Sequence, residues 1–199
     1  MQELTDEQVM LEYKKGNGGA MDELFRRYRT PVFHFACRVC RDEAEAQDVA
    51  QDVFLRVHQA APTYVPSGKF STWIFAIAHN LLMSRLRQRR RWVLWPRQEG
   101  DPDAYAEFPS LEPSPAQEAA AAELATLVRQ CIQGLPLLQK EALVLREYHR
   151  LDYAAISRIL NKPAGTVKTL IFRARQALKE KLRAHVQDTQ GGYHGEPSH

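Results

Sequence analysis

Apolar residues recur along this chain at the three- and four-residue spacing of a single helix face, and they almost nowhere alternate with the period of two that a half-buried strand shows. The run from Met21 to Val39 has this pattern, with Pro31 inside it as an expected kink. A second run begins at Asp42, where Glu45 three residues later completes a capping-box-like start. The periodicity therefore predicts an all-α protein.

Breaks in the periodicity divide the chain into two helical domains. The stretch from Pro62 to Gly68 separates the second run from a third helix, which begins at about Ser71 and ends in a cluster of arginines. Residues 96–115 contain five prolines and several acids with little periodicity, which is the composition of a flexible, extended linker. The predicted boundaries are a first domain at 1–95, the linker at 96–115, a second domain at 116–186 and a disordered tail at 187–199.

The net charge of +3 conceals a strongly uneven distribution of charge. Residues 67–97 hold seven Lys or Arg and no acid, residues 98–128 hold seven acids and no Lys or Arg, and residues 162–183 hold seven basic residues against one acid. Two basic blocks indicate two sites for a phosphate backbone, because bound cations release the counterions condensed on nucleic acid. The alternative is that these blocks are simply solvated helix faces.

Other classes of protein lack support in the sequence. The first residues do not form a basic stretch followed by an apolar run, and no segment reaches the length of a membrane span, so we expect a cytoplasmic protein without direct membrane insertion. His34, Cys37 and Cys40 have ligand-like spacing, but a fourth ligand is not evident and a structural role for the thiols is favoured. No nucleophile or acid–base group converges with others, so we expect neither an enzyme nor a bound metal or cofactor.

The second domain contains the pattern of a helix-turn-helix. The segment LDYAAISRILN is followed by the turn KPAG and then by TVKTLIFRARQALKEKL. The residues expected to pack the two helices together are Ala155, Ile156 and Ile159 against Val167, Ile171, Ala174 and Leu178. The outward positions of the second helix, which suit phosphates and base edges, are then Thr166, Lys168, Thr169, Phe172, Arg173 and Arg175. An ordinary helical hairpin would explain the apolar spacing but not the basic residues, so DNA binding is favoured.

The stretch from Leu135 to Leu182 closely resembles the C-terminal domain of extracytoplasmic-function (ECF) sigma factors of the sigma-70 family. In the first half, EAEAQDVAQDVFLRV and FSTWIFAIAHNLLMSRLRQRRR resemble the polymerase-docking helix and the promoter-melting helix of the same family. The resemblance implies a factor that binds core RNA polymerase, recognises the minus-35 and minus-10 promoter elements and promotes melting. It also implies the polymerase β′ coiled coil and β flap, promoter DNA and a cognate anti-sigma factor as partners.

The resemblance assigns roles to three groups of residues. The core-polymerase-binding residues would be Glu45, Asp48, Gln51 and Asp52, whose polar groups lie off the apolar stripe. The minus-10 DNA-binding residues would be Lys69, Phe70, Trp73, Asn80, Arg85, Arg87, Arg89 and Arg90, with the loop at 63–68, where an extruded base can be held. The minus-35 DNA-binding residues would be Gly165, Thr166, Lys168, Thr169, Arg173 and Arg175.

Four positions depart from the family pattern. His58 replaces a common aromatic residue, and Ser84 stands where Asp is frequent. Leu170 occupies a position where the family often has Arg after the GTVK motif, so one DNA contact is expected to be missing. Arg150 lies at a turn position where Gly is common, which predicts an unusual backbone conformation there.

Two rival interpretations of the function remain: a helix-turn-helix regulator that acts without polymerase, and a thiol or metal sensor that uses Cys37 and Cys40.

Overall fold

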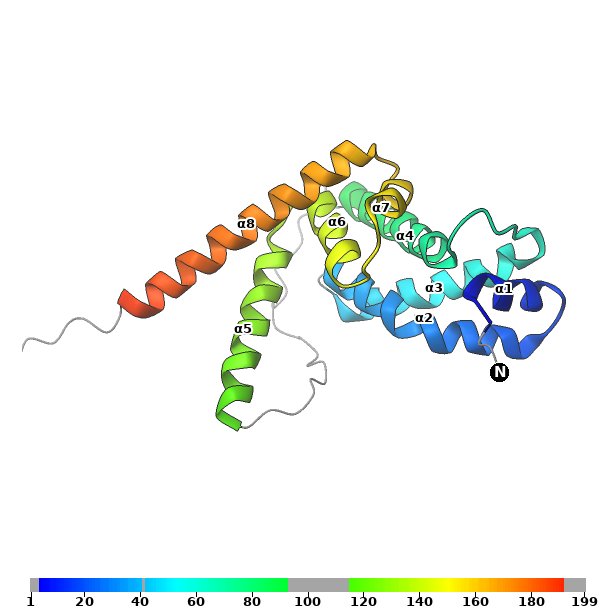
Figure 1. Ribbon diagram of the computed structural model, residues 1–199, viewed down its shortest axis with the longest axis horizontal. Coiled ribbons are helices and arrows are strands. Elements are labelled where there is room, and N and C mark those ends of the chain that lie inside the picture. The colour runs from blue at the N-terminus through cyan, green and yellow to red at the C-terminus, as the bar shows by residue number, and fades with distance from the viewer. Residues whose placement is uncertain (1–3, 41, 93–114, 192–199) are drawn as a thin grey trace, which may run out of the picture.

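The computed structural model describes residues 4–40, 42–92 and 115–191, with side chains described for 4–40, 42–88 and 124–184. Every regular element within these ranges is a helix, so the all-α prediction is confirmed. In chain order the elements are α1 (Asp6–Lys14), α2 (Gly18–Val39), α3 (Glu43–Ala60), the 3-10 turn η1 (Ala61–Thr63), α4 (Phe70–Trp92), α5 (Pro115–Gln133), α6 (Leu137–Glu147), α7 (Tyr153–Leu160) and α8 (Ala164–Gly191) (Figure 1).

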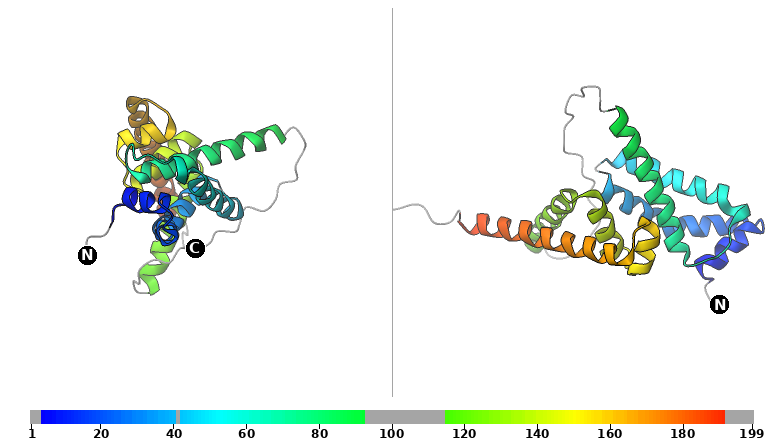
Figure 2. Two further views of the ribbon diagram at one scale, coloured as in Figure 1. Left: turned by 90° about the vertical axis from the view of Figure 1, so that its right-hand side faces the viewer. Right: turned by 90° about the horizontal axis from the view of Figure 1, so that it is seen from above.

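The helices form two groups that pack directly on each other. Helices α1 to α4 make the first group, in which α2 lies against α1, α3 and α4. Helices α5 to α8 make the second group, where α6 and α7 both pack on α8. The groups meet where α7 lies on α4 and where α6 lies on α2, while the far end of α8 projects away from the body (Figures 1 and 2).

The core of the first group is built from the predicted apolar stripes. Leu24, Val32 and Phe35 of α2 are fully buried, and they face the buried Val49 and Val53 of α3 in one continuous core. Burying an aliphatic or aromatic side chain of this kind contributes about 1.5–3 kcal/mol. Pro31 lies inside α2, and the helix continues on both sides of it. The amphipathic pattern read from the sequence therefore predicts most of the buried faces of α2 and α3.

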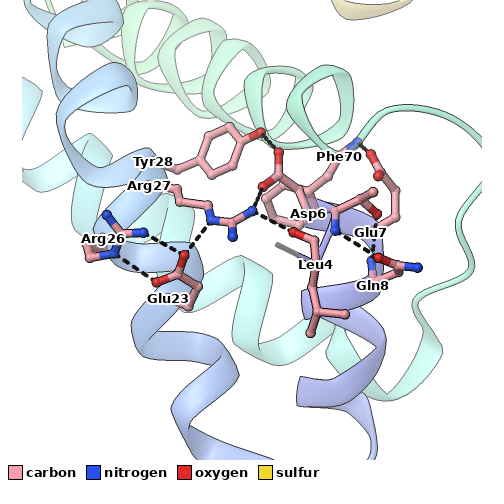
Figure 3. Close-up of polar contacts among 10 residues, drawn as sticks. Leu4, Asp6, Glu7, Gln8, Glu23, Arg26, Arg27, Tyr28 and Phe70 are labelled. Atoms are coloured by element: carbon pink, nitrogen blue, oxygen red, sulfur yellow. Dashed lines mark hydrogen bonds and ion pairs between the residues drawn. The ribbon is translucent and has the colours of Figure 1, made fainter. Parts of the chain in front are cut away.

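Helix α1 ties the beginning of the chain to both α2 and α4, and the sequence patterns did not reveal it. Asp6 accepts hydrogen bonds from Arg27 at 2.7 Å and from the hydroxyl of Tyr28 at 2.5 Å (Figure 3). Glu7 accepts the backbone N–H of Phe70 at 2.6 Å, which satisfies one of the unpaired donors at the N-terminus of α4. Asp6 therefore ties α1 to α2, and Glu7 holds the first turn of α4 in place.

The helix-turn-helix geometry follows the sequence closely. Asp152 caps α7 by accepting the backbone N–H of Ala155 at 2.7 Å, and this hydrogen bond holds the pKa of the Asp152 carboxyl below its usual range. Asn161 ends α7 in the left-handed conformation with a φ of 50°. The predicted packing residues are buried, apart from Leu178, which is partly buried against the same core.

Two predicted boundaries differ from the structure. Helix α8 begins at Ala164 and runs to Gly191, so helical structure continues into the segment expected to be a disordered tail at 187–199. Helix α5 already includes Pro115, the last residue of the expected linker. The remainder of that linker, at 93–114, lies outside the described residues, as does 192–199.

Arg150, in the turn between α6 and α7, has a φ of 55°, as its place at a glycine-favouring position predicted. A side chain in this left-handed region costs about 1–2 kcal/mol, whereas glycine adopts it freely. The greater entropy of glycine in the unfolded chain offsets part of this relief, so we expect Arg150→Gly to raise the free energy of unfolding by only roughly 0.5–1 kcal/mol in urea denaturation. Arg150→Ala, which keeps the Cβ and removes the charge, should leave stability near that of the parent. Equal effects of the two substitutions would contradict the strain argument.

Candidate nucleic-acid interface

A pocket of about 190 Å³ lies at the beginning of α4. Tyr64, Ser67, Gly68 and Lys69 of the preceding loop line it together with Thr72, Trp73 and Ala76 of α4. The rings of Tyr64 and Trp73 are 5.0 Å apart between centroids, and Lys69 is exposed. An aromatic wall beside a cation is the chemistry that holds an unstacked nucleobase and its phosphate.

Phe70 does not fit the predicted role in DNA contact. Its side chain is fully buried, and its ring packs against those of Tyr28, Tyr64 and Trp73. A residue with no exposed surface supports the pocket from within and does not reach a nucleic acid. Trp73, which is half-buried and lines the pocket, keeps one accessible surface.

The remaining predicted residues of α4 have different surroundings. Asn80 is exposed and lies about two helical turns after Thr72, near the same face of α4. It therefore extends the line of the pocket along the helix. Arg87 is exposed as well. Arg85 is instead partly buried and forms an ion pair with Asp52 at 2.6 Å. The side chains of Arg89 and Arg90 lie outside the described residues.

The polar face of α3 is partly engaged within the chain. Asp52 pairs with Arg85 as described, and Asp48 lies 3.6 Å from the same guanidinium while its own side chain remains 67% exposed. Gln51 is exposed and Glu45 is half-buried. The acceptors of Asp48 and Gln51 are therefore more accessible than that of Asp52, a difference that the sequence did not predict.

A groove of about 330 Å³ adjoins Gln51 between α2 and α3. Its apolar lining comes mainly from Phe25, Phe33 and Phe54, and Arg29 supplies a cation at its side. The Phe25 ring packs against Phe54 with centroids 4.8 Å apart and is still 45% exposed. Phe25 belongs to the apolar run from Met21 to Val39, and only its exposure shows that it forms part of a surface.

Helix α8 presents its predicted outward residues to solvent. Gly165, Thr166, Lys168, Thr169 and Arg173 are all exposed. Arg175 is exposed too, but its guanidinium forms an ion pair with Glu147 of α6, which raises the pKa of Arg175. Leu170 is half-buried and packs against the core, so an apolar residue suits its position.

Buried polar contacts join the two groups of helices. His79 of α4 and Glu141 of α6 are hydrogen-bonded at 2.9 Å, and Glu141 has no exposed surface. The neighbouring Lys140 is also buried, and its ammonium group donates to Gln133 at 2.9 Å and to the backbone carbonyl of Val39 at 3.5 Å. Gln133 donates in turn to the carbonyl of Arg38 at 3.1 Å, so α5 and α6 cap the C-terminus of α2.

His149 lies in the same interface between aromatic rings of the first group. Its ring centroid is 4.4 Å from that of Phe75 and 6.0 Å from that of Phe35. Its Nε2 is buried without a hydrogen-bond partner. Desolvation, followed by the positive charge of Arg38, lowers the pKa of His149 to about 4. The interface therefore holds this imidazole in its neutral form.

The cysteines have the surroundings of structural residues. Cys40 is buried and its thiol donates to the carbonyl of Ala36 at 2.9 Å, while Cys37 is half-buried. Burial raises the pKa of Cys37 to about 11 and that of Cys40 to about 12, so both thiols stay protonated at neutral pH. In the part of the chain that is described, no three His, Cys, Asp or Glu side chains converge on a point where a metal ion would fit.

None of the described helices combines the length and apolar character needed to cross a bilayer.

Comparison with known proteins assigns both halves of the chain. Residues 24–92 match Sigma-70 region 2, and residues 125–178 match Sigma-70 region 4. The chain is 32% identical over 193 residues to the RNA polymerase sigma-H factor of Pseudomonas aeruginosa, which covers 92% of this chain and 96% of that protein. It is 30% identical over 175 residues to the ECF RNA polymerase sigma factor SigW of Bacillus subtilis, which covers 86% and 94% of the two chains.

Solved structures share the fold. The sigma factor RpoE of Bartonella quintana, in complex with the anti-sigma factor NepR, superimposes with a TM-score of 0.67 at 21% identity over 81% of this chain and 96% of that one. CnrH, in complex with the cytosolic domain of CnrY, gives a TM-score of 0.66 at 23% identity over 90% and 97% of the two chains. Both likenesses are to the arrangement of helices.

A helical domain with an aromatic and basic pocket, followed by a helix-turn-helix domain, defines the class of two-domain promoter-binding proteins. Two sigma-70 regions match, and the named relatives match over more than nine tenths of their own length. The chain therefore belongs to the ECF sigma factors of the sigma-70 family. It is therefore an RNA polymerase sigma factor that recognises promoters. The resemblance predicted from the sequence is confirmed.

The buried, neutral His149 predicts a pH dependence of stability. The unfolded chain binds a proton on this residue below about pH 6.5, whereas the folded protein binds it only near pH 4, so stability falls as pH falls through this window. Between pH 7 and pH 5 we expect His149 to lower the free energy of unfolding by about 2 kcal/mol. Urea titrations of His149→Leu should lack this loss, and His58→Leu, at an exposed position on α3, should retain it. An unchanged pH dependence in His149→Leu would show that the interface does not bury the imidazole.

Proposed function

We propose that α3 with the adjoining groove docks on core polymerase, that the pocket and Asn80 of α4 hold the minus-10 strand, and that α8 reads the minus-35 element. The observation that carries this division is the separation of three exposed surfaces with different chemistry. One is acidic and apolar, one is aromatic with cations, and one is a basic helix after a tight turn. The described segments 4–92 and 115–191 would then act as the two functional domains on either side of the linker.

The docking surface combines polar acceptors with an apolar groove. Asp48 and Gln51 offer exposed oxygen atoms, and the groove lined by Phe25 and Phe54 offers apolar area beside them. A helical partner with basic residues and one apolar side chain, such as the polymerase β′ coiled coil named by the family resemblance, fits this combination. Asp52 acts in this proposal through Arg85, which it holds beside the surface.

The minus-10 surface captures a base that has left the stack. The half-buried Trp73 ring, supported by the buried Tyr64 ring packed against it, provides stacking area. Lys69 provides a cation for the adjacent phosphate, and Asn80 provides an amide one turn beyond Ala76. Trapping an extruded base offsets part of the unstacking energy of a few kcal/mol and thereby favours the melted state. In this proposal these residues carry out the promoter melting that the family resemblance implies. Arg87 would contact the DNA strand beyond the pocket.

The minus-35 surface is the exposed face of α8. Thr166, Lys168 and Thr169 lie in its first turns, where a recognition helix meets base edges, and Arg173 lies one turn further on. The sigma factor RpoE, which shares this fold, is described in complex with the anti-sigma factor NepR, and this supports the proposal that the present chain also has an anti-sigma factor. Since polymerase and promoters are cytoplasmic, we propose that the protein acts there as a non-catalytic subunit.

Charge reversal at the docking surface tests the first assignment. We expect Asp48→Arg to weaken binding to purified core polymerase at least tenfold, since reversing a charge in a desolvated contact costs several kcal/mol. Binding would be measured by competition with another sigma factor. Asp22→Arg, at another exposed carboxylate on α2, serves as the control and should bind like the parent. If both variants retain parental affinity and native helicity, α3 is not the docking helix.

The salt dependence of duplex binding tests the third assignment. Each phosphate contact contributes about 0.9 to the slope of log affinity against log salt, so Arg173→Ala in the full chain should flatten that slope by about one. Arg175→Ala should flatten it by less, because Arg175 is already paired with Glu147. An unchanged slope with relaxed sequence preference would place Arg173 on a base, and an unchanged slope with unchanged preference would remove α8 from the DNA interface.

A further inference from the structure

One helix, α1, holds both ends of the loop that lines the base pocket. This pocket loop, residues 65–69, is exposed and lies between two buried residues, Tyr64 and Phe70. The ammonium group of Lys14 donates to the backbone carbonyl of Tyr64 at 2.8 Å. The carboxylate of Glu7 accepts the backbone N–H of Phe70 at 2.6 Å. Because positions 7 and 14 are about two helical turns apart, one face of α1 makes both contacts.

The same helix also supports the aromatic wall of the pocket. Asp6 accepts the hydroxyl of Tyr28, whose ring packs against the Phe70 ring with centroids 5.1 Å apart (Figure 3). The Phe70 ring packs in turn against the Trp73 ring, with centroids 5.5 Å apart. Contacts from α1 therefore lead both to the backbone of the pocket loop and to the ring on which a base would stack.

The contacts at the two ends of the pocket loop bear on binding through entropy. An exposed loop loses conformational freedom when a ligand fixes it, and a loop that is already held in place loses less. Glu7 and Lys14 are not among the residues that line the pocket. Apart from the effect of their charges, they can act on a strand in the pocket only through Phe70 and Tyr64.

We propose that α1 is a positioning element of the minus-10 site, in which Glu7 and Lys14 hold the pocket loop in the conformation that captures an extruded base. This inference rests on the proposed function, because it concerns the same pocket. Both side chains are positioning residues, since they act through the main chain at Phe70 and Tyr64. Loss of either contact keeps every lining residue in the chain but releases one end of the pocket loop.

Two neighbouring lysines separate positioning from charge. Lys14→Ala removes the contact with the carbonyl of Tyr64. Lys15→Ala removes the next cation along the chain, which is also exposed but pairs with Glu12 on α1 instead. Both substitutions lower the net charge by one, so only the contact with the pocket loop distinguishes them.

Three substitutions of acids on α1 make the corresponding comparison at the other end of the loop. Glu7→Ala removes the acceptor of the Phe70 N–H, whereas Glu7→Gln keeps an oxygen atom that can accept it. Glu12→Ala removes an acid that contacts only Lys15 through its side chain. Circular dichroism verifies that each full-length variant keeps the parental helicity. If Glu7→Ala does not, the comparison of Lys14→Ala with Lys15→Ala decides alone.

Binding of a short fluorescein-labelled single-stranded DNA of mixed sequence to each full-length protein is measured by fluorescence anisotropy. We expect Glu7→Ala and Lys14→Ala each to weaken binding about fivefold, the factor that corresponds to one lost hydrogen bond, and Glu7→Gln and Lys15→Ala to stay within about twofold of the parent. The sign for Glu7→Ala is diagnostic. Loss of an acid ordinarily tightens binding to an anionic strand, as Glu12→Ala should show.

The Trp73→Ala background distinguishes positioning from a general loss of folded protein. Once the stacking ring is gone, an ordered pocket loop has little base to hold, so the effects of Glu7→Ala and Lys14→Ala should shrink to less than about twofold. A general loss of folded protein would reduce binding by the same factor in both backgrounds. Equal factors in the two backgrounds would therefore refute the positioning role.

The single substitution Trp73→Ala also separates failure of this inference from failure of the proposed function. If Trp73→Ala weakens probe binding while Glu7→Ala and Lys14→Ala bind like their controls, the pocket takes a strand and α1 does not position it. If Trp73→Ala binds like the parent, the pocket is not a site for a single strand, and the proposed minus-10 role falls together with the inference.

Discussion

The buried pair between His79 and Glu141 fixes how the two halves of this sigma factor lie on each other. Glu141 has no exposed surface, and leaving one partner of a buried hydrogen bond unsatisfied typically costs about 1–3 kcal/mol. Lys140, directly before it, points its ammonium group at the end of α2. Two adjacent residues of α6 therefore hold both long helices of the first domain. The positions of α7 and α8 relative to the base pocket depend on these contacts.

The same first domain uses its polar groups for internal order as well as for function. Glu7 holds the first turn of α4, and Asp52 holds Arg85, so the pocket and the helix that extends from it are positioned before any ligand binds. Preorganised groups lose less entropy when they bind. The surfaces with accessible polar atoms, around Asp48, Asn80 and α8, are the ones that we propose bind partners.

Helix identity, the helix-turn-helix and its packing residues were predictable because they depend on local periodicity and on caps such as Asp152 and Asn161. The left-handed turn at Arg150 was predictable for the same reason. Helix α1 was not, because it is short and only weakly amphipathic and is held by distant partners such as Arg27. Burial of Phe70 and the pairing of Asp52 with Arg85 depend on contacts between segments far apart in sequence, which periodicity does not encode. The interface between the domains, with two adjacent charged residues in its interior, is the least predictable feature of all, since Lys and Glu ordinarily indicate a solvated face.

The most direct test of the account is promoter-specific runoff transcription with purified core polymerase and a genomic promoter library from the host. The account predicts that the full chain directs core enzyme to defined start sites on duplex templates, and that core alone yields none of these transcripts. A chain that binds duplex DNA through α8 but never supports initiation by core polymerase would contradict it, because that behaviour belongs to a helix-turn-helix regulator acting without polymerase.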